Sequence, residues 1–123
     1  YIGVAESSSL DKRLWKQELN AIGHGTFFRS VGAMLGYRPE RGSLIGKSNK
    51  HNYKFSKEKE ELIKQWMQNN LIVNCVNDND SLEEREKLLI KQYHPLLNIK
   101  NNPDALECLE QDRNECRDIA NSQ

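Results

Sequence analysis

The stretch SLEEREKLLIKQYHPLLN, residues 81–98, combines a clear helical pattern with one acid in an unexpected place. At roughly 100° per residue, one side of this helix is apolar and Glu86 lies in the middle of that side. The apolar positions are Leu82, Leu89, Ile90 and Tyr93. Because an unpaired buried charge costs several kcal/mol, Glu86 either reaches the rim of the core, pairs with a buried Arg or Lys, or binds a hard cation such as Mg²⁺.

The same stretch also predicts where its helix begins and ends. Ser81 is followed three residues later by Glu84, which is the pattern of a capping box. Pro95 disfavours helical geometry in the residue before it. We therefore expect a helix that begins after Ser81 and ends near Tyr93.

The rest of the chain alternates between helical and extended patterns. Periodic apolar residues predict four further helices. The first spans residues 10–20 and follows a Ser9 cap, and the second spans 26–35. The third begins after a Ser56 cap, and the last spans 103–119. β-branched residues predict strands at 1–5 and 71–76, and a short strand or an extended lead-in at 52–55. Strands separated by helices indicate a small α/β (α+β) domain, in which a few strands are covered by helices.

Length and composition are those of one globular domain. The chain has 123 residues, of which 37% are hydrophobic and 29% charged, and no apolar run long enough to cross a membrane. Its three cysteines lack a C-x-x-C spacing, so we expect a reducing, cytoplasmic location without disulfides or zinc. The net charge of zero conceals a first half (1–57) at +6 and a second half (58–123) at −6.

The positive charge gathers in residues 38–57, where aromatic residues are interleaved with Lys and Arg. A basic loop of this kind suits a phosphate backbone, and its aromatics can stack on unpaired bases; the alternative is a solvated loop. The predicted nucleic-acid-binding residues are Arg29, Arg38, Arg41, Lys47, Lys50 and Lys54.

Three short motifs together resemble the GIY-YIG nuclease family. They are YIG at residues 1–3, LDKRL at 10–14, and E-x-x-L-I-K-x-x-x-P-x-x-N from Glu86 to Asn98. LNIKNNP at 97–103, followed by a helix, is similar to small bacterial stand-alone members. The resemblance covers residues 1–98, so we expect one nuclease domain over 1–123 with its core in 1–98 and a helical extension in 99–123.

The resemblance implies a fold and a site. The fold is a small mixed three-stranded sheet flanked by helices. The activity is a metal-dependent DNA endonuclease that hydrolyses phosphodiester bonds with a single Mg²⁺ or Mn²⁺ ion. The catalytic residues would be Tyr1, Arg13, Glu86 and Asn98, with Glu86 as the sole protein ligand of the metal. The partner would be DNA, and no membrane would be involved. Both DNA strands would be cut either by a homodimer or by a monomer acting twice.

Each of these residues could instead have an ordinary structural role. Arg13 would form a surface salt bridge, Tyr1 would be an amphipathic strand residue, and Asn98 would be a turn residue. The sequence also departs from the family pattern, because the first motif, GIY, is absent and Gln17 stands where many members have a His. These departures favour a non-catalytic DNA-binding module of the same fold as the alternative function. A protein-interaction domain with an acidic last helix is the third.

Overall fold

The structure is a computed structural model that describes residues 1–6, 8–78 and 81–123. These residues form helices joined by loops. The helices are η1 (Asp11–Leu19), α1 (Thr26–Met34), α2 (Lys57–Asn70), α3 (Leu82–Tyr93) and α4 (Glu107–Asn121). The described residues contain no β-strand, so the predicted α/β (α+β) fold with a three-stranded mixed sheet is wrong.

The segments predicted as strands lack neighbours with which to form a sheet. In segment 1–5, the backbone N–H and C=O of Ile2 are both bonded to the side chain of Asn98. In segment 71–76, Ile72 is 91% exposed and Val76 88% exposed. Within the described ranges, no backbone hydrogen bond links that segment to another extended one. β-propensity measures how well a residue fits a half-buried pleated surface, and such a surface does not form around segment 71–76.

The helix predictions were better. Four of the predicted helices correspond to η1, α1, α2 and α3 within a few residues, and the predicted last helix corresponds to α4. The Ser56 cap is confirmed, because its hydroxyl accepts the Lys59 N–H at 3.4 Å. The Ser81 capping box is wrong, because no side-chain hydrogen bond caps α3. The first helix is wound as a π-helix, with the Asn20 N–H bonded to the carbonyl of Trp15.

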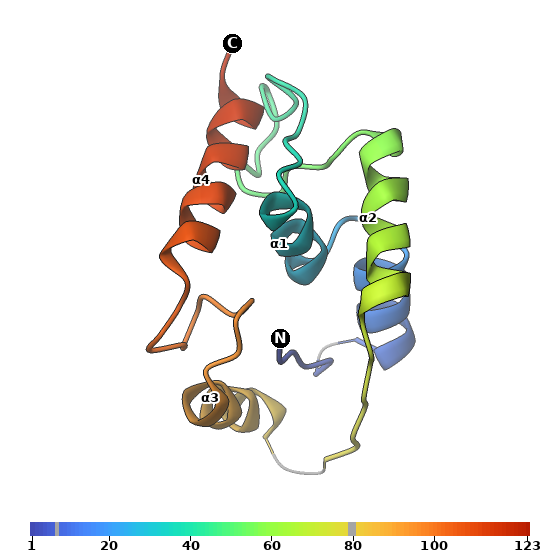
Figure 1. The fold of residues 1–123 in the computed structure, drawn as a ribbon, viewed down its shortest axis with the longest axis vertical. Helices are drawn as coiled ribbons and strands as arrows, with labels where there is room; N and C mark the ends of the chain where they lie inside the picture. The colour runs from blue at the N-terminus through green and yellow to red at the C-terminus, as the bar shows by residue number, and fades with distance from the viewer. Residues whose placement is uncertain (7, 79–80) are drawn as a thin grey trace.

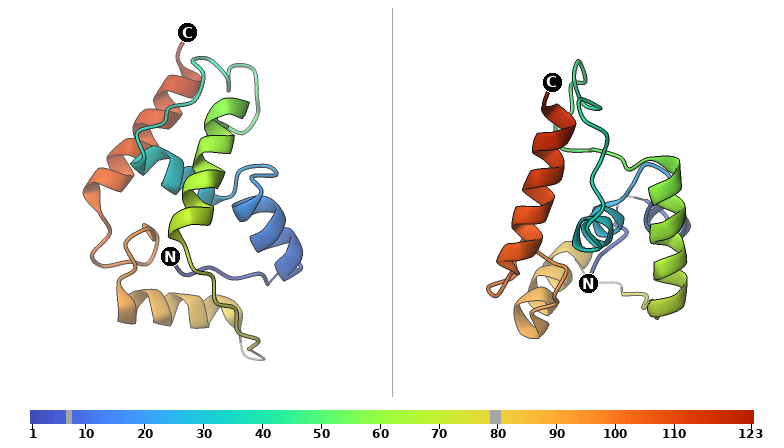
Figure 2. Two further views of the ribbon diagram at one scale, coloured as in Figure 1. Left: turned by 45° about the vertical axis from the view of Figure 1, so that its right-hand side comes forward. Right: turned by 45° about the horizontal axis from the view of Figure 1, so that its top comes forward.

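Helix α1 lies in the middle of the molecule, with α2 on one side and α4 on the other (Figure 1). Helix α3 lies across the end opposite the C-terminus, and the N-terminal segment runs between α3 and α1. The two turned views show the same arrangement (Figure 2). No helix among the described residues is long and apolar enough to cross a bilayer.

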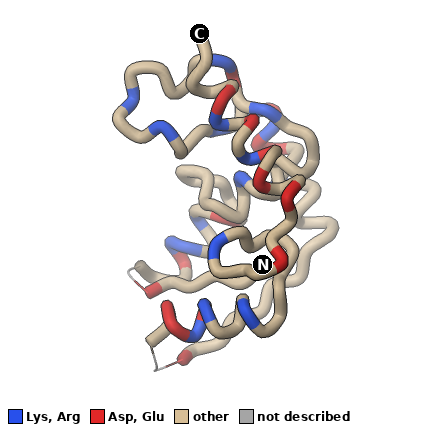
Figure 3. The backbone as a smooth tube through the Cα atoms, turned by 90° about the vertical axis from the view of Figure 1, so that its left-hand side faces the viewer, with Lys and Arg blue, Asp and Glu red and all other residues tan. Residues whose placement is uncertain are grey.

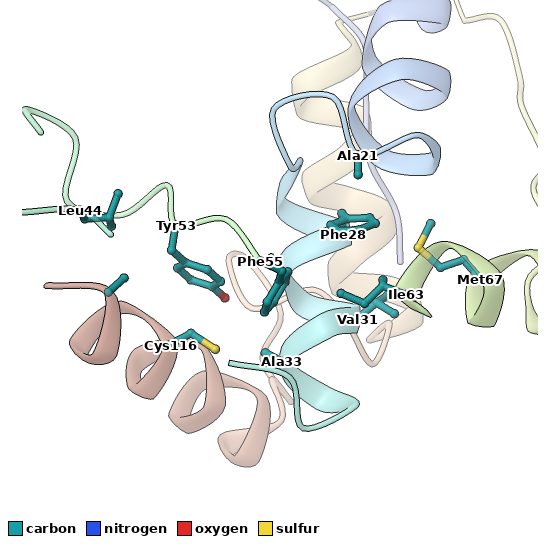
Figure 4. Packing of buried hydrophobic residues seen from close by; sticks show 11 residues of the cluster. Ala21, Phe28, Val31, Ala33, Leu44, Tyr53, Phe55, Ile63, Met67 and Cys116 are labelled. Atoms are coloured by element: carbon teal, nitrogen blue, oxygen red, sulfur yellow. The ribbon is translucent and has the colours of Figure 1, made fainter. Parts of the chain in front are cut away.

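The core surrounds α1 (Figure 4). Phe28 and Val31 of α1 are buried, and Ile63 of α2 packs against this cluster. Gly32 permits the close approach of α2, because a Cβ there would meet the Phe55 ring and lie 2.8 Å from Ile63 Cδ1. Other members are Ala21, Ala33, Leu44, Tyr53, Phe55, Met67, Cys116 and Ala120.

Helix α4 also fixes the long loop between α1 and α2. The Gly42 N–H donates to the carbonyl of Ile119 at 3.1 Å, and the Leu44 N–H donates to that of Ala120 at 2.8 Å. Asn121 adds a side-chain bond to the carbonyl of Lys50 at 3.0 Å. The basic loop is therefore anchored to the C-terminal end of α4.

Candidate active site

Tyr1 and Arg13 line one pocket of about 440 Å³. Its walls come from the N-terminal segment, η1, Phe27 of α1 and residues 71–78. The Tyr1 ring lies on Phe27, with 4.9 Å between ring centroids, and Tyr1 remains 41% exposed. The first two residues that the family resemblance named thus face a common space.

Asn98 supports this site from the loop between α3 and α4. Its Oδ1 accepts the Ile2 N–H at 2.8 Å, and its Nδ2 donates to the Ile2 carbonyl at 2.8 Å. The Asn98 carbonyl in turn accepts Asn102 Nδ2 at 2.9 Å, and Asn98 is only 7% exposed. Asn98 is therefore more than a turn residue, because it holds the backbone next to Tyr1.

Glu86 lies on α3 and is partly buried. In the part of the chain that the structure describes, its carboxylate makes no hydrogen bond and no ion pair, so the buried-partner alternative is wrong. Burial raises the pKa of Glu86, while the nearby Arg13 and Lys100 oppose that shift. Glu86 and Arg13 therefore lie close enough to interact electrostatically.

The phenol of Tyr1 belongs to the same electrostatic group. Burial raises its pKa above the ordinary value of 10.0, and the charges of Glu18 and Glu86 raise it further, whereas Arg13 lowers it. The phenol is consequently protonated at neutral pH. In that form it can donate a hydrogen bond to an anionic oxygen or to water.

Glu18, which pairs with Arg13, was not predicted as a residue of this site. Its Oε1 lies 3.4 Å from Arg13 Nη1, and its other oxygen accepts the Phe28 N–H at 2.9 Å in the first turn of α1. Glu18 is only 4% exposed. The alternative for Arg13, a surface salt bridge, is thus partly right. Arg13 does form an ion pair, but its partner is buried. Gly25 makes room for the Glu18 carboxylate, because a Cβ there would collide with it.

The donor chemistry of the site fits a hard cation. No group of three or more His, Cys, Asp or Glu side chains that could hold a metal occurs among the described residues. Mg²⁺ does not need such a group, because it commonly binds one or two carboxylates and keeps several waters. A single partly buried carboxylate without a protein partner, as at Glu86, has this character.

His24 lies in the core, where its side chain contacts Phe28, Phe55 and Glu60. It is 2% exposed, and its ring stacks on Phe28 at 4.8 Å between centroids. Nε2 lies 3.3 Å from Glu60 Oε2. Burial lowers the pKa of His24 to about 4, so it is neutral at physiological pH. These contacts make His24 part of the packing between α1 and α2.

Two of the predicted nucleic-acid-binding residues have partners within the protein. Arg29 is only 7% exposed, and its guanidinium lies 5.9 Å from the centre of the Tyr53 ring. Arg38 bridges to Asp112 at 2.5 Å and to Glu115 at 2.7 Å, both on α4. Arg29 is therefore buried and Arg38 is paired, so neither guanidinium is freely open to a partner.

The other four lie on the anchored loop, which projects beside the C-terminus and carries basic positions (Figure 3). Arg41 donates to Ser122 Oγ at 3.1 Å, and Lys50 donates to the Leu44 carbonyl at 3.0 Å. Lys47 and Lys54 line a second pocket, of about 480 Å³. Neither makes an ion pair or a side-chain hydrogen bond within the described residues. Their charges are therefore open to a partner.

Comparison with known proteins agrees with the motifs. The GIY-YIG catalytic domain family matches residues 1–117, which is nearly the whole chain. Neither a curated protein nor a solved structure matches. The matched range spans the YIG, LDKRL and E-x-x-L-I-K-x-x-x-P-x-x-N segments that contain Tyr1, Arg13, Glu86 and Asn98. The chain therefore belongs to the GIY-YIG catalytic domain family.

Proposed function

We propose that this protein is a metal-dependent DNA endonuclease that hydrolyses phosphodiester bonds with a single divalent cation. Family membership supports nuclease activity in general and DNA as the substrate. The observation that favours catalysis is a partly buried carboxylate, Glu86, that has no partner among the described residues and is acted on by the charge of Arg13. A DNA-binding module without activity does not need this arrangement, because ionising a half-buried acid costs free energy.

Each residue has a role that follows from its chemistry. Arg13 neutralises the negative charge that grows on the phosphoryl oxygens, because a planar guanidinium can bind two of them at once. Tyr1, with its raised pKa, donates a hydrogen bond to the reacting oxygens or orients the attacking water. Asn98 fixes the backbone beside Tyr1 through its two bonds to Ile2.

Glu86 would hold the cation, Mg²⁺ or Mn²⁺. When bound, this ion supplies Lewis-acid stabilisation of the leaving oxygen. The charge of Arg13 favours the ionised form of Glu86, which is the form that binds a cation. Loading of the site is therefore expected to be stronger at neutral than at acidic pH.

Relaxation of supercoiled plasmid tests the proposal. The wild-type protein should nick the plasmid in Mg²⁺ and not in EDTA. Arg13→Ala and Glu86→Gln should each lower the rate by about 100-fold or more, as loss of a transition-state contact does. A Glu86→Gln rate equal to that of the wild type would refute the metal assignment. Salt-sensitive binding without any cleavage would favour the non-catalytic module instead.

A nuclease can cut both strands either as a homodimer or by acting twice. The described residues give no support to the homodimer. Sedimentation of the protein with and without DNA would decide between the routes. A monomer that converts nicked plasmid to linear form slowly would indicate two successive reactions. A dimer would indicate paired cuts.

A further inference from the structure

The guanidinium of Arg13 is held on one side only. Its Nη1 lies 3.3 Å from Gln17 Oε1 and 3.4 Å from Glu18 Oε1. Its Nε and Nη2 donate to no residue in the described ranges. The unoccupied Nε–Nη2 edge presents two parallel N–H groups, which match two oxygens of a phosphate.

The π-helical winding of η1 makes this arrangement possible. In an α-helix, at roughly 100° per residue, Glu18 would lie about 140° around the axis from Arg13. In a π-helix, backbone bonds join residues five apart, so Arg13 and Glu18 come onto the same side. Gln17, four residues after Arg13, reaches the same nitrogen.

We propose that Gln17 and Glu18 form a positioning clamp for Arg13, which aims its free edge at the phosphodiester to be cut. The clamp rests on the proposed function, since it assigns the polar groups that orient that site's phosphate contact. It also gives Gln17 a role at the position where many family members have a His. Gln17 then orients Arg13 and moves no proton.

The Glu18 carboxylate is a rigid base for this clamp. It is almost fully buried, and one oxygen is fixed by the Phe28 N–H at the N-terminus of α1. Gly25 leaves the space that the carboxylate fills. A hydrogen bond from α1 therefore determines where the other oxygen, and with it Arg13, can lie.

A double-mutant cycle on the cleavage rate tests the coupling. Glu18→Gln keeps an acceptor for the Phe28 N–H and removes the charge that faces Arg13. We expect kcat to fall about 10- to 100-fold with little change in KM, because misplacing a catalytic group by about 1 Å can cost about 100-fold. In an Arg13→Ala background the same change should have almost no effect. Equal losses in both backgrounds would overturn the clamp.

Glu60→Gln is the matched control. Glu60 is also a buried acid, 8% exposed, but it lies on α2 and pairs with His24 and Lys64. It should leave kcat unchanged at temperatures where the variant is folded. Gln17→Ala is a second clamp variant, which should lower kcat in the wild-type background and not in Arg13→Ala.

Side-chain NMR separates the clamp from the proposed function. In ¹⁵N-labelled protein at low temperature, the Arg13 Nη–H signals are assigned by their loss in Arg13→Ala. They should be resolved in the wild type and should coalesce in a Gln17→Ala/Glu18→Gln variant. Coalesced signals in the wild type would overturn the clamp whether or not the protein cleaves DNA. Resolved signals without cleavage would leave the clamp standing and refute the nuclease proposal.

Discussion

The side-chain amide of Asn98 bonds to the backbone of Ile2 as a neighbouring strand would. Oδ1 accepts the Ile2 N–H and Nδ2 donates to the Ile2 carbonyl, both at 2.8 Å. The two residues are 96 positions apart in the chain. This pair therefore fixes the N-terminal segment, and Tyr1 with it, to the loop that follows α3.

Replacing Asn98 by Asp should destabilise the fold and lower activity. The carboxylate can still accept the Ile2 N–H, but it cannot donate to the Ile2 carbonyl and repels it. We expect a loss of about 1–3 kcal/mol in the free energy of unfolding, measured by urea titration. Asn69→Ala, at an exposed position of α2, is the control and should change little. An Asn98→Asp variant as stable as the wild type would show that the pair does not hold the segment.

His24 should make the protein sensitive to acid. Because burial lowers its folded-state pKa to about 4 from the ordinary 6.5, folding favours the neutral ring. The stability it contributes is complete above pH 6.5 and is lost as the pH falls from 6.5 towards 4. The full loss is about 3 kcal/mol.

His24→Asn isolates this effect, because Asn tolerates the positive φ of 54° at that position. Urea titrations from pH 4 to 8 should give a variant that is less stable at neutral pH but whose stability changes less with pH. If both proteins have the same pH dependence, His24 is not the responsible group.

Gly32→Ala should destabilise the core. Ala has a higher helix propensity than Gly by about 1 kcal/mol. The added Cβ, however, would meet the Phe55 ring and lie 2.8 Å from Ile63 Cδ1, and such overpacking typically costs about 1–3 kcal/mol. We expect a lower Tm by calorimetry. Ile63→Val, which removes Cδ1, should cost less in the Gly32→Ala background than alone; a more stable Gly32→Ala would contradict the close approach of α1 and α2.

We expect the lysines of the basic loop to contribute unequally to the affinity for DNA. Lys47 and Lys54 have no partner within the described chain, whereas Lys50 donates to the Leu44 carbonyl. Neutralising Lys47 and Lys54 together should reduce the slope of log affinity against log salt by up to about 2. Lys50→Gln, the matched control, should change it less. Equal slopes for all three proteins would place the DNA elsewhere.

The helices could be predicted from the sequence because they depend on local patterns. The periodicity of residues 82–93 and the Ser56 cap were enough for α3 and α2. The sheet could not be predicted reliably, because a strand requires a neighbour that the local sequence does not specify. LIVNCV has the composition of a strand, yet Ile72 and Val76 remain exposed.

The candidate site was likewise predicted only in part. The resemblance to the GIY-YIG family predicted Tyr1, Arg13, Glu86 and Asn98. The charges of Arg13 and Glu86 both act on the phenol of Tyr1, and the charge of Arg13 acts on Glu86. Glu18 was missed because α-helical periodicity places it away from Arg13, and only the π-helical winding of η1 brings the two together. Burial of Arg29 was missed because it depends on packing around Tyr53.

Anomalous scattering from crystals soaked in Mn²⁺ tests the central claim most directly, that the Glu86 carboxylate binds a divalent ion opposite Arg13. We predict one anomalous peak beside Glu86 in the wild-type protein and its loss in Glu86→Gln. A wild-type crystal without a peak there, or a Glu86→Gln crystal that keeps it, would contradict the claim.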